Sequence, residues 1–149
     1  MILDERTEIA DAVSLNTGAA GTYLIGDQID LTVARDVGNG QPVYLVITVD
    51  TTATSGGSAT GTFVLASDAS ASIATDGSAT EHFRTSAFPL ASMTAGTVLA
   101  CVPLPLEGTV YERYLGLLQI TGTAAFTGGK VNAFLTFDPS KYKAYDNAI

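Results

Sequence analysis

The alternation of apolar and polar residues is the clearest structural signal in this chain. In residues 43–50, the side chains of Val43, Leu45, Ile47 and Val49 lie on one face at a period of two. Most residues of this stretch are β-branched or aromatic, the types that fit a pleated, half-buried surface. The pattern therefore predicts a strand whose Leu45 and Ile47 belong to the core.

Similar patterns predict further strands along the rest of the chain. They cover residues 22–25, 29–33, 61–65, 81–85, 97–104, 110–121 and 130–137. Small polar residues fill segments 51–58 and 67–79, which predicts loops, and a loop as long as the second is often functional or mobile. About eight strands without a strong helix predict an all-β, antiparallel two-sheet β-sandwich. Periodicity alone fits a jelly roll and an immunoglobulin-like sandwich equally well.

The ends of the chain are less regular than its middle. Asp4 could cap a short helix with Ile9 and Val13 on one face, and an extended arm accounts for the same residues. We therefore divide the chain into an N-terminal arm or short helix (residues 1–21), a sandwich (residues 22–139) and a C-terminal tail (residues 140–149).

Composition adds that part of the surface faces another protein. The 149 residues suffice for one domain with a real core; 46% are hydrophobic and only 15% are charged, against a usual quarter. Disorder would also lower the charge content only with low hydrophobicity, whereas the mean hydropathy is +0.29. The shortfall of charge therefore suggests a surface that is covered by a partner chain.

Charge and targeting signals narrow the class of partner. The net charge is −8, and no run of basic residues exists that would bind phosphates, so we expect no nucleic acid. No apolar stretch approaches the roughly 20 residues of a membrane span, so we expect no membrane partner. The N-terminal stretch has Asp4, Glu5 and Glu8 where a signal peptide needs basic residues. We expect a protein made in the cytoplasm.

The single cysteine excludes an internal disulfide and a zinc cluster. Cys101 lies in the apolar run of residues 97–102, and free cysteine is among the most buried residue types. The sequence therefore predicts that Cys101 is a small buried hydrophobe.

His82 is the only histidine and the first candidate for catalysis. Asp76, Glu81, Ser78 and Ser86 are near it in sequence, so a hydrolase triad can be imagined. No Gly-x-Ser-x-Gly nucleophile elbow is present, and no glycine run is placed to form an oxyanion hole. We therefore expect a histidine at the surface or rim, and a protein that is not an enzyme.

Cofactor and metal motifs are also missing from the sequence. The acidic residues come singly, without an Asp-x-Asp-x-Asp-Gly calcium loop. The glycine-rich stretches follow no phosphate-binding pattern. We expect no cofactor and no metal.

Four blocks of sequence carry a resemblance to a known family. They are Met1-Ile2-Leu3-Asp4, the turn Ala34-Arg35-Asp36-Val37-Gly38-Asn39-Gly40 with the strand at 43–50, residues 112–117 (Glu-Arg-Tyr-Leu-Gly-Leu), and residues 129–139 (Gly-Lys-Val-Asn-Ala-Phe-Leu-Thr-Phe-Asp-Pro). In order and rough spacing they resemble the capsid cement (decoration) proteins of tailed bacteriophages. None of the blocks is a catalytic motif, so the likeness concerns scaffold and assembly.

The resemblance implies a fold, a partner and a location. The fold is a jelly roll, and the partner is the phage major capsid protein on the outer surface of an icosahedral head in the virion. A homodimer at two-fold axes is favoured, and a trimer at three-fold positions is the alternative.

Candidate interface residues come from the matched blocks and the tail. Arg35 and Arg113, next to Asp36 and Glu112, could reach carboxylates of a neighbouring subunit, or they could form solvated turn pairs worth about 0–1 kcal/mol. The tail is basic and aromatic on an acidic chain, which suits a docking arm better than a frayed end. The full set is Arg35, Asp36, Glu112, Arg113, Phe134, Tyr142 and Tyr145.

A receptor- or carbohydrate-binding jelly roll on the virion is the alternative function. Such modules typically offer exposed Trp or Tyr platforms to a sugar. This chain has no Trp, and its six Tyr gather at strand edges and in the tail. The capsid cement function is therefore the better hypothesis.

Overall fold

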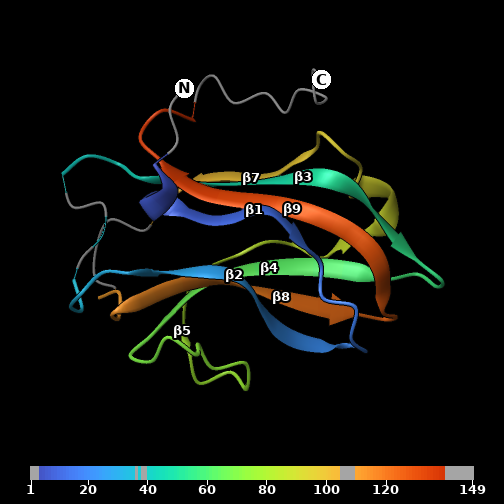
Figure 1. The fold of residues 1–149 in the computed structure, drawn as a ribbon, viewed down its shortest axis with the longest axis horizontal. Coiled ribbons are helices and arrows are strands. Elements are labelled where there is room, and N and C mark those ends of the chain that lie inside the picture. The colour runs from blue at the N-terminus through green and yellow to red at the C-terminus, as the bar shows by residue number, and fades with distance from the viewer. Residues whose placement is uncertain (1–3, 36, 38–39, 105–109, 140–149) are drawn as a thin grey trace.

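The computed structural model describes residues 4–35, 37, 40–104 and 110–139, which form two antiparallel β-sheets packed face to face (Figure 1). Sheet A contains, in spatial order, β1 (Glu8–Ser14), β9 (Phe126–Thr136), β3 (Tyr44–Ser55) and β7 (Val98–Pro103). Sheet B contains β2 (Gly21–Asp30), β8 (Tyr114–Gly122), β4 (Thr60–Asp68) and β5 (Thr80–Arg84), and the short β6 (Phe88–Pro89) also pairs with β4. Two 3₁₀ helices, η1 (Glu5–Thr7) and η2 (Leu90–Ser92), complete the elements.

The pairing of strands defines a jelly roll. Strand β1 pairs with β9, β2 with β8, β3 with β7 and β4 with β5. The first half of the chain and the second half thus form one long antiparallel hairpin that is rolled across two sheets. The predicted antiparallel sandwich is confirmed, and this strand order distinguishes the jelly roll from the immunoglobulin-like alternative.

The core lies between the sheets, where the sequence pattern placed it. Leu45 and Ile47 of β3 are fully buried, and Phe63 of β4 and Leu117 of β8 belong to the same cluster. Burying a side chain of this kind stabilises the fold by about 1.5–3 kcal/mol. Strand β3 is buried on its other face as well, since Val46 is also fully buried. Strand β3 is therefore an interior strand and not a half-exposed one.

The long polar segment after β4 is an ordered cover over the outer face of sheet B. Ile73 is 2% exposed and packs in a second apolar cluster with Val64 and Leu118. Asp68 holds the segment by accepting the N–H groups of Ser70 and Ala74, each at 3.0 Å. These hydrogen bonds lower the pKa of Asp68 below its ordinary value. The sequence predicted this loop, and Ile73 is the anchor of its fold.

The N-terminal segment is part of the sandwich. Asp4 caps a short helix as predicted, accepting the Arg6 N–H at 3.0 Å, but the helix is the 3₁₀ turn η1. Residues Ile9 and Val13 then lie in β1, which pairs with β9. The sandwich therefore begins at Glu8 and not at residue 22. The ladder to β9 outweighs the weak helical pattern of this segment.

Two predicted breaks in strands are absent from the structure. The segments 22–25 and 29–33 belong mostly to one strand, β2, with a register shift between Ile25 and Ile29. Gly26 lies at this irregularity with a φ of 72° and against the backbone of Ile9, where a side chain would not fit. Strand β3 likewise continues to Ser55, into the segment predicted as a loop.

Cys101 corrects another prediction, because its side chain is exposed. It lies in β7, the outermost strand of sheet A. The register of β7 shifts between the Ile47–Ala100 and Thr48–Val98 pairs, so that the consecutive residues Leu99 and Ala100 are both buried. Cys101 follows on the outer side. An apolar run read without this bulge puts the cysteine inside.

We predict that Ile47→Asp prevents soluble folding. The position is fully buried, so the variant would bury an unpaired carboxylate at a cost of several kcal/mol, a large share of a small domain's stability. Soluble yield and the thermal melt measure the effect. Thr51→Asp, at an exposed position of the same strand, is the control and should fold normally. A soluble Ile47→Asp protein with an unchanged melting temperature would contradict the strand register.

Candidate interaction surfaces

Arg113 forms a forked ion pair within the chain. Its Nε and Nη2 donate to the two carboxylate oxygens of Asp30, each at 2.9 Å, and its guanidinium lies 4.9 Å from the centre of the Tyr114 ring. The pair joins the end of β2 to the start of β8. Both side chains are roughly half exposed, at 48% and 41%. Arg113 therefore orders this end of sheet B and still presents a charged surface.

The pair changes the ionisation of Asp30. The hydrogen bonds from Arg113, followed by the Thr32 N–H, lower the pKa of Asp30 from 3.8 to about 2. The same contact raises the pKa of Arg113 above its ordinary value. Both groups thus stay charged over the whole physiological range.

The other predicted charged residues are close to this pair. Arg35 is exposed, donates from Nη2 to Thr32 Oγ1 at 3.0 Å, and forms a two-way backbone bridge with Tyr111. Glu112 accepts the Thr80 hydroxyl at 2.7 Å. The structure thus brings Arg35, Glu112 and Arg113 to one end of the sandwich, where each contacts a residue of its own chain.

The remaining candidates fall into two groups. Phe134 has only 3% of its surface exposed, so its ring offers no open area to a partner. The periodicity correctly placed it opposite the core face of β9, but that face is covered here. Asp36, Tyr142 and Tyr145 lie outside the described residues.

An apolar pocket lies at the same end of the molecule as Arg113, and we call this region the loop end (left in Figure 1). The pocket has a volume of about 350 Å³. It is formed mainly by apolar side chains from four separate segments, together with Asp4 and two threonines. The apolar members are Ile29, Leu31, Val37, Val43, Leu135 and Phe137.

Exposed apolar side chains and acidic residues surround this pocket. Phe137 is 62% exposed, and Val33 and Val110, in the segments that lead to and from the Arg35–Tyr111 bridge, are 56% and 63% exposed. A neighbouring hollow shares Ile29 and is lined by acidic groups. These are Glu5, Glu8, Asp27 and Asp30. Large exposed apolar groups within a polar rim are typical of a protein–protein contact site.

His82 belongs to a buried polar cluster near the loop end. Its Nε2 lies 2.7 Å from Ser67 Oγ, which also accepts the Glu112 N–H at 3.0 Å. The imidazole stacks on the Tyr111 ring with centroids 3.8 Å apart and planes at 19°. These contacts connect β5, β4 and the segment before β8. Sequence neighbours suggested Asp76, Glu81, Ser78 or Ser86 as partners, whereas the sheet supplies residues from distant segments.

The serine–histidine contact of this cluster has the distance of a nucleophile and its base. A nucleophile must also be reached by substrate, and Ser67 has no exposed surface. Its oxygen is already engaged by a backbone N–H. The arrangement is therefore suited to holding β5 in place and not to acyl transfer.

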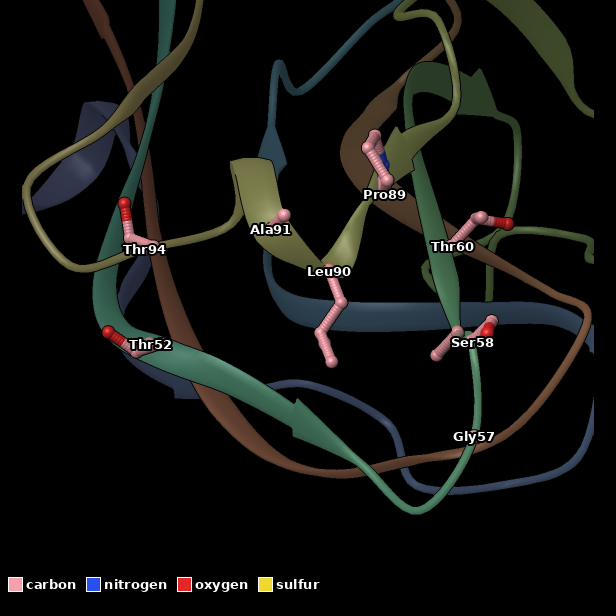
Figure 2. Close-up of a pocket in the computed structure, with 9 residues that line it drawn as sticks. Thr52, Gly57, Ser58, Thr60, Pro89, Leu90, Ala91 and Thr94 are labelled. Atoms are coloured by element: carbon pink, nitrogen blue, oxygen red, sulfur yellow. The ribbon is translucent and has the colours of Figure 1, made fainter.

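A second pocket opens at the other end of the sandwich, between the β3–β4 connection and η2 (Figure 2). Its volume is about 570 Å³, and every lining residue is uncharged. Thr52, Ser58, Thr60 and Thr94 contribute hydroxyl groups, and Leu90 supplies the largest apolar side chain. The pocket has none of the charged groups that bind phosphates, metals or ionised substrates.

Two further searches cover the described residues. Within that part of the chain, no cluster of three or more His, Cys, Asp or Glu is arranged to hold a metal ion. No helix in the same ranges is long and apolar enough to cross a membrane.

Comparison with known proteins gives one match. The model of a protein family described as Bbp16 matches residues 9–135, which is most of the chain. No curated protein matches this sequence. The matched range begins in β1 and ends in β9, so it spans the jelly roll from its first strand to its last.

We predict that Arg113→Gln raises the pKa of Asp30 from about 2 toward 3.8, because the forked hydrogen bonds are its largest cause. The pair contributes stability above pH 3.8, and this contribution is lost as the pH falls through about 2. Carboxyl chemical shifts followed by NMR give the pKa. Arg35→Gln removes a neighbouring guanidinium that contacts only Thr32, so its Asp30 should titrate as in the wild type. An unchanged pKa in Arg113→Gln would contradict the assignment.

A second prediction concerns His82 and acid. Burial lowers the pKa of His82 below 6.5, against a smaller opposing effect of Glu112, and Nδ1 is buried without a hydrogen-bond partner in the described structure. Folding therefore favours the neutral ring, so its contribution is present above pH 6.5 and is lost as the pH falls below that value. The wild-type melting temperature should fall more steeply between about pH 7 and about pH 5 than that of His82→Phe, which keeps the stacked ring. Parallel pH profiles would show that His82 titrates freely.

Proposed function

This chain belongs to the Bbp16 family, a phage-related protein family, and from that premise we propose that it is a capsid cement protein. It binds the outer surface of an icosahedral phage head and stabilises the shell by non-covalent contacts. The proposal assigns it no catalytic activity and no cofactor. Its partners are the major capsid protein and further copies of itself, and its location is the virion.

One observation carries this proposal. The sequence blocks that resemble cement proteins are far apart in the chain, yet their described parts converge on the loop end. Asp4, Val37, Val43 and Phe137 line its pocket, and Arg113 holds the adjacent end of β2. A surface built from all the matched blocks is the natural place for the family's shared contact.

The loop end also has the chemistry of a contact with a capsid. Val33, Val110 and Phe137 expose apolar area that stabilises the protein only when a partner covers it. The acidic rim would pair with basic groups of the partner and suppress contacts between acidic copies of this chain. We propose that the capsid protein occupies the pocket with an apolar side chain flanked by basic residues.

Cementing follows from mass action. A protein that binds the assembled shell and not its dissociated subunits shifts the equilibrium toward assembly. Many copies on one shell multiply a modest individual affinity. No catalytic group is needed for this function, and the buried His82 cluster is consistent with a purely structural domain.

We predict that the double variant Val33→Lys/Phe137→Lys folds but no longer binds heads. Both positions are more than half exposed, so the core is unaffected, while the new charges must be desolvated in the contact. Each loss of about 1.4 kcal/mol lowers the affinity of a site tenfold. Co-sedimentation with undecorated heads measures occupancy, and heat-induced DNA release measures protection.

The matched control is Ala71→Lys, which adds a lysine at an exposed position in the cover of sheet B. It should bind and protect heads as the wild type does. Full occupancy and protection with the double variant would contradict the loop end as the capsid contact. Failure of the wild-type protein to bind heads would contradict the proposed function itself.

A further inference from the structure

The four sheet edges of this jelly roll differ in how they are protected against pairing with another chain. A strand at an edge presents unpaired backbone groups, and natural proteins guard such edges with charges, bulges or short strands. Three edge strands carry at least two charged side chains each. These are Glu8 and Asp11 in β1, Asp27 and Asp30 in β2, and Glu81 and Arg84 in β5. Strand β7 carries none.

The neighbourhood of β7 is uncharged as well. Residues 97–104 contain no Asp, Glu, Lys or Arg, although the chain as a whole has a net charge of −8. Val98 is 42% exposed, and Cys101 and Pro103 are also exposed. This edge therefore combines open apolar side chains with the lowest electrostatic barrier to an approaching strand.

The phase of the β3–β7 ladder shows which backbone groups are open. The Leu104 N–H donates to the Val43 carbonyl at 2.8 Å, and Val102 faces Leu45 two residues away. Backbone groups alternate in direction along a strand, so those of Cys101 and Pro103 point away from β3. Pro103 has no N–H, which makes the open side the place where it fits. Cys101 then offers both a donor and an acceptor at the centre of the open edge.

We propose that β7 pairs antiparallel with β7 of a second copy of this chain, about a two-fold axis at Cys101. The N–H of each Cys101 donates to the carbonyl of the other, and the two A sheets join into one continuous sheet. This inference rests on the self-association included in the proposed function, and it names the surface that performs it.

Charge explains why a second copy fits this edge. Two molecules of net charge −8 repel each other, so their contact must avoid the acidic edges. An antiparallel pair of β7 strands places only uncharged residues opposite one another. The same pairing of β1, β2 or β5 would bring carboxylates of both copies together. The β7 edge is thus compatible with itself in a way that the other edges are not.

The unique cysteine is a built-in reporter of this contact. Residues directly opposite each other in an antiparallel pair lie on the same face, with Cα atoms about 5.5 Å apart when they exchange hydrogen bonds. The two exposed Cys101 thiols would therefore be neighbours. A short bismaleimide should crosslink the native wild-type protein into a covalent dimer, and Cys101→Ser, which removes the thiol and keeps the strand, should give none.

Light scattering coupled to size exclusion tests the surface itself. We expect the wild type and Cys101→Ser to be dimers, and Cys101→Lys, which places two ammonium groups at the axis, to be a monomer with an unchanged melting temperature. Ala71→Lys makes the same change of charge away from β7 and should remain a dimer. A monomeric or trimeric wild type, or a dimeric Cys101→Lys protein, would overturn the proposal.

The same measurements separate this inference from capsid binding. Val33→Lys/Phe137→Lys should lose the heads but remain a dimer, because the loop end is distinct from β7. Cys101→Lys should lose the dimer and still bind heads, with the lower occupancy of a single site. A monomeric Val33→Lys/Phe137→Lys protein would place self-association at the loop end and overturn the β7 contact. Loss of head binding by the wild type would instead remove the proposed function and leave the dimer result standing.

Discussion

The pairing of β3 with β9 is the constraint on which the rest of the structure depends. The two strands are far apart in sequence, yet they form the centre of sheet A, with Leu45 opposite Leu135 and Ile47 opposite Ala133. Closing so large a loop costs conformational entropy before any contact repays it. The repayment is the burial of both faces of β3, which no other arrangement of this hydrophobic run would achieve. Once β3 and β9 are paired, β7 and β1 have only the outer positions left.

The loop end follows from the same pairing. Because β3 begins where β9 ends, Val43 and Phe137 must lie together there, and the pairing of Asp30 with Tyr114 brings the end of β2 to the same side. The Arg113–Asp30 fork and the His82–Ser67–Glu112 contacts then fix the segments around it. A rigid β scaffold thus carries a contact surface made of its connections, the usual division of labour in β-sandwiches.

The sequence predicted the strands better than their surroundings. Period-two alternation marked β3, β4 and the interior strand β8, because a sandwich buries one face of every strand and both faces of the central ones. It missed β1, whose short helical pattern is overruled by pairing with β9. It also placed Cys101 inside, since a bulge shifts the phase of β7 and no residue type announces that shift.

Site residues were predictable only in part. The matched blocks pointed to Arg35, Glu112 and Arg113, and these residues do gather at one end. The partner of Arg113, Asp30, is far away in sequence, and only the β2–β8 register brings the two together. The same holds for His82, whose contacts with Ser67 and Tyr111 depend on the order of strands in sheet B. Local sequence cannot reveal contacts that topology creates.

The most direct test of the central claim is a cryo-electron microscopy map of undecorated phage heads incubated with the purified protein. Our account predicts extra density on the outer surface of the shell, into which the jelly roll fits with its loop end against the capsid protein. Density should be absent from the inner surface and from heads treated with the loop-end variant. A map without added density, or one in which the loop end points away from the shell, would contradict the account.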